Sequence, residues 1–248
     1  MMKYISSKDN PIYKLVNELA TKHKKTNHIL LENRKHIISA IESGFEIVHL
    51  IRRAGFDETF GVSERSIVDF DPGLFDRLST VETPQGYIAV FNKPERDIEL
   101  SKVNKILYLD RVQDPGNIGT IIRSAVAFGI NAILYNEGCA DPYSQKVIRS
   151  SAGYTLNIPT YKASNDNIFE IAKNEKFTTI SLVAKGDKNI GEIKAAKYIL
   201  IAGNEGSGID KKVIERSDIK ASIPTQVESL NVAMAVSIAL YQLSKGDH

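Results

Sequence analysis

The feature that most constrains the fold is a regular alternation of strand-like and helical runs in the second part of the chain. Short apolar runs typical of buried strands occur at residues 106–109, 132–135, 180–183 and 198–202. Helical patterns occur after Asn117, around residues 143–151 and over residues 168–174. Such alternation is typical of βαβ units, whose parallel strands are buried between layers of helices. We therefore predict an α/β fold with a parallel sheet here.

A smaller α/β pattern precedes this part. Asn10 and Pro11 are typical of an N-cap and the first residue of a helix, which we predict over residues 10–23. A second helical pattern around residues 37–41 ends at Gly44. Further strand-like runs lie at residues 28–31, 47–51, 66–70 and 86–91, and a turn lies at residues 83–86. The polar, aperiodic residues 92–104 are predicted to link two domains, at residues 1–95 and 104–248.

Composition narrows the class of protein. The longest nearly unbroken apolar stretch, residues 232–241, is about half of the roughly 20 residues that a membrane helix needs, so no bilayer insertion is expected. No apolar run of signal-peptide length follows Met1, and Cys139 is the only cysteine, which suits a reducing compartment. The five histidines lack metal-ligand spacing. We expect a cytoplasmic protein without a metal site.

The charge is unevenly distributed along the chain. Net charge is only +2, yet residues 1–36 hold eight basic and three acidic side chains, a local charge of +5. This segment either contacts phosphate or forms a solvated helix face followed by a lysine-rich loop.

Three loops after predicted strands are the candidate functional sites, because ligands of open α/β sheets bind beyond the carboxyl ends of the strands. The first, residues 110–123, turns at a Pro-Gly pair and enters a helix that carries Arg123. The second, residues 203–208, has three glycines in six residues and exposes main-chain groups. It lacks the sequence order of a phosphate loop or a dinucleotide fingerprint, which disfavours a nucleotide triphosphatase and a conventional dehydrogenase.

The third loop, residues 223–233, leads into a predicted helix over residues 228–243. Glu228, Ser229 and Asn231 are predicted in its first turn, where capping would need only one such residue. The helix is apolar nearly all round, so we expect it to be buried in the core or in a subunit interface.

Together the three loops resemble the three motifs of the SpoU family of RNA ribose methyltransferases, within the SPOUT class. Asn117-x-Gly119-x-x-x-Arg123 is similar to the first motif and Gly203-x-Glu205-x-x-Gly208 to the second. Ile223-Pro224 followed by Glu228-Ser229-Leu230-Asn231-Val232 is similar to the third, with a shorter connecting loop than is usual. Residues 1–92 resemble more weakly the family's ribosomal-protein-like substrate-binding domain.

The resemblance implies a fold, an activity and a set of site residues. It implies an RNA-binding N-terminal domain, a knotted methyltransferase domain, a homodimer, and methyl transfer from S-adenosylmethionine to a ribose 2′-hydroxyl, with ribosomal RNA favoured over transfer RNA. The residues implied to line the catalytic site are Arg123, Asn117, Glu205, Ser229 and Asn231. Those implied to hold the cofactor are Gly203, Ile223, Leu230, Gly208 and Pro224.

Two questions stay open at the level of sequence. Arg123 is either a base, forced by desolvation, or a cation that clamps phosphate and orients the ribose. A guanidinium normally stays protonated, which favours the second role. The alternatives to a ribose methyltransferase are a non-catalytic RNA-binding protein on the same scaffold and an enzyme that methylates a base.

Overall fold

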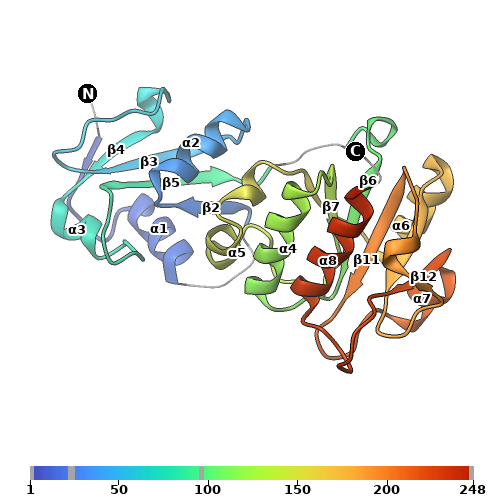
Figure 1. Cartoon of the computed structure of the whole chain (residues 1–248). Helices are drawn as coiled ribbons and strands as arrows, with labels where there is room; N and C mark the ends of the chain where they lie inside the picture. Colours follow the sequence, from blue (N-terminus) through green and yellow to red (C-terminus); the bar gives the residue numbers. More distant parts are fainter. Residues whose placement is uncertain (1–2, 22–25, 95–97, 246–248) are drawn as a thin grey trace. The chain divides into compact units, whose positions relative to one another are not determined.

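The computed structural model describes residues 3–21, 26–94 and 98–245. The chain divides into two compact units, Met1–Glu95 with Tyr143–Gln145 and Arg96–Pro142 with Lys146–His248 (Figure 1). None of the helices within the described ranges is long and apolar enough to cross a membrane.

The N-terminal unit is a mixed sheet with helices. Its strand order is β1 (Lys3–Ile5), β4 (Ile67–Phe70), β3 (Ile47–Arg53), β5 (Tyr87–Asn92) and β2 (His28–Leu31). Its helices are α1 (Pro11–Thr21), α2 (Arg34–Glu42) and α3 (Pro72–Asp76). Asn10 precedes α1 as predicted and accepts a hydrogen bond from the Ile12 amide (2.9 Å). Residues 22–23 of the predicted first helix lie outside the described ranges, and the short β1 and α3 were not predicted.

The C-terminal unit contains the predicted parallel sheet. Its order is β10 (Lys188–Asn189), β12 (Ile219–Ser222), β9 (Thr178–Leu182), β11 (Tyr198–Gly203), β6 (Lys105–Asp110), β7 (Ala132–Tyr135) and β8 (Thr160–Lys162). All the paired neighbours are parallel. Its helices are α4 (Pro115–Ala127), α5 (Gln145–Ser150), α6 (Asn165–Glu175), α7 (Lys211–Arg216) and α8 (Val232–Ser244).

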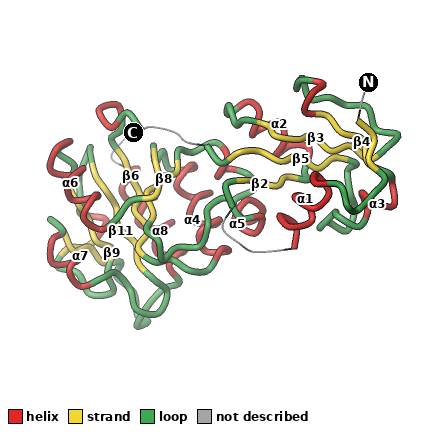
Figure 2. The backbone as a smooth tube through the Cα atoms, turned by 180° about the vertical axis from the view of Figure 1, so that it is seen from behind, coloured by secondary structure: helices red, strands yellow, loops and turns green. Residues whose placement is uncertain are grey.

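Helices cover both faces of this sheet (Figures 1 and 2). Alternate residues of β6 point to opposite faces: Leu107 packs with α4 and α8, whereas Ile106 packs with α6 and α7. Because both faces are buried, the strands are continuous apolar runs rather than alternating ones. This burial explains why the sequence pattern located the central strands.

Two helix starts differ from the prediction. Helix α4 begins at Pro115, with Asp114 as its N-cap, so Asn117 lies inside its first turn. Helix α8 begins at Val232 and not at residue 228, because Asn231 is its N-cap and accepts hydrogen bonds from the amides of Ala233 and Met234. The polar residues before Asn231 therefore belong to a loop.

Helix α8 is only partly buried in the single chain. Ala233, Val236 and Leu240 face the core, whereas Met234 and Tyr241 are 58% and 50% exposed. The core accounts for only part of the burial predicted for this helix, and burial of its other face in a subunit interface stays a prediction. One face packs on the sheet and α4, and the other is uncovered.

Candidate active site

A pocket of about 620 Å³ lies beyond the carboxyl ends of β9 and β11, within the usual size range of small-molecule sites. Its walls come from residues 182–184, 202–209 and 228–232, together with Ile214, Ile223, Thr225 and Ala235. Among the predicted site residues it is lined by Gly203, Glu205, Gly208, Ile223, Ser229, Leu230 and Asn231. Asn117, Arg123 and Pro224 are not among its lining residues.

The glycine-rich loop after β11 folds back on itself at the pocket wall. The backbone groups of Asn204 and Gly208 form a reciprocal pair of hydrogen bonds (3.1 and 3.0 Å). A side chain on Gly203 would place its Cβ 2.3 Å from the Ile209 nitrogen, so only glycine fits there. The Asn204 Oδ1 accepts from the amides of Gly206 and Ser207 (both 2.9 Å). This loop is therefore a defined main-chain surface rather than a loose connection.

Asn117 joins the second and third motifs. Its Nδ2 donates to Glu205 Oε1 (3.0 Å), and its Oδ1 accepts from Asn231 Nδ2 (3.1 Å). Because the Asn231 Oδ1 caps α8, the Asn231 side chain is held in place and in turn orients the Asn117 amide. Asn117, Glu205 and Asn231 thus form a connected cluster at the edge of the pocket.

Glu205 is held as a carboxylate. Burial acts to raise the pKa of Glu205, but hydrogen bonds from the Asn117 side chain and from the backbone amides of Asp114 and Gln113 outweigh burial, so the pKa lies below its usual value. The carboxylate accepts these bonds and fixes the loop that precedes α4 against the glycine-rich loop. Its role in the geometry is to hold Asn117.

Ser229 and Arg123 are the two predicted catalytic residues whose side chains lack such partners. Neither side chain makes a hydrogen bond or an ion pair with any described residue. Ser229 is exposed in the pocket wall, where its hydroxyl can bind a ligand. Arg123 is exposed on α4, next to Ser124, whose hydroxyl bonds Ser237 of α8 (2.7 Å).

A buried carboxylate that the sequence analysis missed supports the same loops. Asp110 at the end of β6 is fully buried. It accepts from Arg111 Nε (3.0 Å), Asn136 Nδ2 (2.6 Å) and the Asp210 amide (2.7 Å). Arg111 also donates to the Gly208 carbonyl (3.4 Å), and its own carbonyl accepts from Asn204 Nδ2 (2.9 Å). An Asp directly after an apolar strand run was the available signal.

Arg111 has an unusual backbone conformation. Its φ of +59° lies in the left-handed region, which costs a non-glycine residue about 1–2 kcal/mol. The bonds to Asp110 and Gly208 hold it there. The side chain is therefore placed to brace the glycine-rich loop, and the pKa of Arg111 is raised by its hydrogen bonds to Asp110.

The donor set of the pocket favours a cationic or neutral ligand with an apolar part. Leu182, Ile223 and Leu230 supply apolar walls, and Glu205 and Glu228 supply negative charge. The described lining contains no Lys or Arg, the side chains that commonly bind phosphate groups. Nor does the described part of the chain contain a cluster of three or more His, Cys, Asp or Glu side chains that could hold a metal ion.

Comparisons with known proteins agree with this architecture. A Bacillus subtilis protein named 23S rRNA (guanosine(2553)-2'-O)-methyltransferase RlmP is 33% identical over 98% of this chain and 99% of its own. The fold is similar to an AdoMet-bound rRNA methyltransferase from Sinorhizobium meliloti (TM-score 0.83, 24% identity, 98% of both chains). It is also similar to the SpoU methyltransferase AviRb from Streptomyces viridochromogenes with AdoMet (TM-score 0.84, 24% identity, 96% and 98% covered).

The family model described as the SpoU rRNA Methylase family matches residues 104–241, which include all three motifs and the whole pocket. With this match and the near full-length relative, the chain belongs to the SpoU rRNA methylase family.

Proposed function

We propose that the protein transfers the methyl group of S-adenosylmethionine to a ribose 2′-hydroxyl of large-subunit ribosomal RNA. The observation that carries the proposal is the Asn117–Glu205–Asn231 cluster, because it joins all three family motifs at one pocket. The relative named as a 23S rRNA 2'-O-methyltransferase spans both units of this chain, which favours ribosomal RNA over transfer RNA.

The pocket residues fit this cofactor. S-adenosylmethionine supplies an electrophilic methyl group on a positively charged sulfur when it is bound. Leu182, Ile223 and Leu230 would contact its apolar parts, and the main chain of residues 203–208 would hold its polar groups. The acidic and neutral lining suits a cation better than an anion.

The chain's own residues can position the ribose. A 2′-hydroxyl is a weak nucleophile, so most of the rate must come from its placement against the methyl group. Asn117 and Ser229 present polar side chains at the pocket edge, and Glu205 keeps Asn117 oriented. Arg123 acts as a cation that clamps the adjacent phosphate, because a guanidinium stays protonated at neutral pH.

The proposal includes a homodimer. Met234 and Tyr241 form an exposed apolar face of α8, a helix without charged residues. Helix α8 packs against α4, which carries the exposed Arg123. A second copy that covers this face would bury it and bring Arg123 to a subunit interface. Arg123 does not line the pocket of its own chain. In a dimer, Arg123 would be able to reach a cofactor site.

The knot and the cytoplasmic location belong to the same proposal. The chain leaves β12, lines the pocket beyond the ends of β9 and β11, and reaches Asn117 on α4 before it enters α8. This path supports a threaded C-terminal segment of the kind that the family has. The cytoplasmic location is proposed because the single cysteine, Cys139, suits a reducing compartment.

One labelling experiment tests the activity. The full chain is incubated with methyl-labelled S-adenosylmethionine and an unmodified 23S rRNA transcript. We expect one internucleotide bond to become resistant to alkali, because methylation removes the 2′-hydroxyl that alkali uses. Arg123→Ala should abolish transfer while cofactor affinity is kept, and Arg123→Lys should be nearly as inactive because it lacks the planar fork. Label on a base, or RNA binding without transfer, would contradict the proposal.

A further inference from the structure

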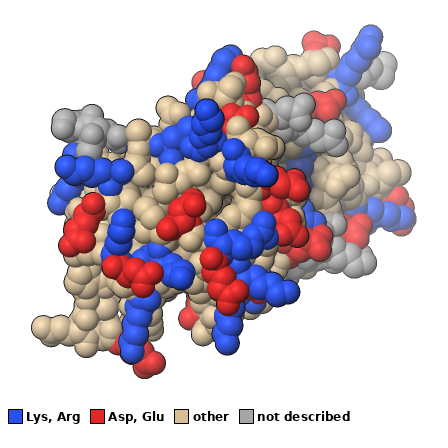
Figure 3. Space-filling view, turned by 90° about the vertical axis from the view of Figure 1, so that its right-hand side faces the viewer, with Lys and Arg blue, Asp and Glu red and all other residues tan. Residues whose placement is uncertain are grey.

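Two segments of the C-terminal unit carry basic side chains and no acidic side chain of their own. Residues 115–131 and 142–161 contain Arg123, Lys146 and Arg149 but no Asp or Glu. On the face that Figure 3 presents, Lys and Arg side chains are instead interspersed with Asp and Glu. We name the side chains of Arg123, Lys146, Arg149 and Tyr154 the α4–α5 surface.

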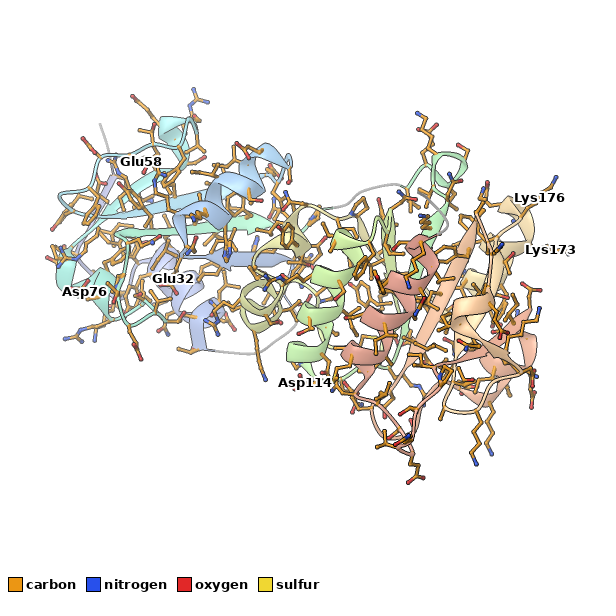
Figure 4. The ribbon with its side chains drawn as sticks, viewed as in Figure 1. Glu32, Glu58, Asp76, Asp114, Lys173 and Lys176 are labelled. Carbon is orange, nitrogen blue, oxygen red and sulfur yellow. The ribbon has the colours of Figure 1, made fainter. Side chains whose placement is uncertain are left out.

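Close packing brings together the segments that carry these four side chains. The Ser150 hydroxyl donates to the Pro115 carbonyl (3.2 Å), and a Cβ on Gly119 would lie 1.9 Å from the Ser150 Oγ. Lys146 pairs with Asp114 (3.7 Å), the N-cap of α4 (Figure 4). Arg123 lies one helical turn beyond Gly119 on the same face. The short turn Tyr154–Leu156 also packs on α4.

The cations and the aromatic ring of this surface are available. Arg123 and Arg149 are exposed, and neither side chain has a hydrogen bond or ion pair within the described ranges. Tyr154 is 43% exposed. Ala152 and Gly153, with φ of +53° and +85°, reverse the chain just before it. An alanine in the left-handed region costs about 1 kcal/mol or more, so the turn that presents Tyr154 is maintained at the expense of stability.

We propose that the α4–α5 surface binds the RNA strand flanking the methylated nucleotide, with Arg149 on a backbone phosphate and Tyr154 stacked on a base. The inference rests on the proposed function. Unpaired cations beside an exposed aromatic ring match single-stranded nucleic acid, in which every base offers a face for stacking. Arg123, assigned to the reacting nucleotide, lies at one end of this surface.

The test uses the full chain and the unmodified 23S rRNA transcript. Tyr154→Ala should weaken RNA binding by about 5- to 100-fold, the range of one lost base stack, and Tyr154→Phe should restore it. The slope of log affinity against log salt concentration is negative. Arg149→Gln should make it less steep by about 0.7–0.9, as expected for one lost phosphate contact. Affinity for S-adenosylmethionine should be unchanged in all three variants.

A matched control separates specific contact from net charge. Lys173→Gln removes one exposed positive charge from α6, on the other side of the sheet (Figure 4), and should leave RNA binding unaltered. Equal RNA affinity and salt slope in wild type, Tyr154→Ala and Arg149→Gln would overturn the inference. So would loss of dimers in these variants, since the surface would then be a protein interface. If the wild type itself fails to methylate ribose, the proposed function is wrong, whatever the RNA affinities are.

Discussion

The Asn117 side-chain amide donates to the Glu205 carboxylate across 3.0 Å, although 88 positions separate the two residues in the sequence. The contact places the first turn of α4 against the glycine-rich loop after β11. Strands β6 and β11 are neighbours in the sheet, so their carboxyl ends lie side by side and the loops that follow them meet. The active-site geometry is therefore built by sheet order.

Gly203 tests whether the folded-back loop forms the cofactor site. Gly203→Ala should lower the midpoint of thermal unfolding and abolish S-adenosylmethionine binding, because the new Cβ would lie 2.3–2.6 Å from backbone atoms of Ile209 and Gly208, which cannot move independently. Gly206→Ala is the control, since its Cβ would meet nothing closer than 3.6 Å. Calorimetric titration measures the cofactor affinity of both variants, and a thermal unfolding curve gives the midpoint. Wild-type affinity in Gly203→Ala would contradict the assignment.

Arg111 allows backbone strain to be separated from side-chain bonding. Arg111→Ala and Arg111→Gly both lose the bonds to Asp110 and Gly208, but only glycine relieves the φ of +59°. Arg111→Gly should therefore be more stable than Arg111→Ala by about 1 kcal/mol in urea unfolding. Both should bind the cofactor more weakly than wild type, because the loop has lost its brace. Equal stabilities would show that the position carries no strain.

Glu205 should make stability depend on pH. The pKa of Glu205 in the folded state lies below the unfolded value of about 4.5. Its contribution to the free energy of unfolding is therefore complete above pH 4.5 and is lost as the pH falls through the folded-state pKa. The difference in melting temperature between wild type and Glu205→Gln should be largest near neutral pH and should shrink in acid. Glu228→Gln, a pocket residue without a hydrogen bond to any described residue, serves as control. A pH-independent difference would refute this role.

The exposed face of α8 predicts the oligomeric state. Wild type should sediment as a dimer at micromolar concentration, and Met234→Asp should shift it to monomer, because a charge would have to be buried in an apolar contact. Tyr4→Asp changes a similarly exposed residue, 57% accessible, on the N-terminal unit and should leave the dimer intact. A monomeric wild type would remove this part of the proposal.

The sequence alone determined the class of fold and the location of the three motifs. The runs at residues 106–109 and 198–202 are apolar because both faces of the parallel sheet are buried, and burial leaves a local, readable pattern. The order of the motifs was sufficient to indicate the family and its cofactor. Short elements such as β1 and α3 were missed because three to five residues carry too little periodicity.

Only the tertiary structure decided which residues meet. Asp110 is a site-supporting residue because Asp210, 100 positions away, places its amide 2.7 Å from the carboxylate. Helix α8 starts at Val232 because the Asn231 side chain turns back to cap it, a choice that an apolar run does not reveal. Arg123 belongs to the first motif yet lies outside the pocket. Contacts of this range depend on strand order and packing, which periodicity does not encode.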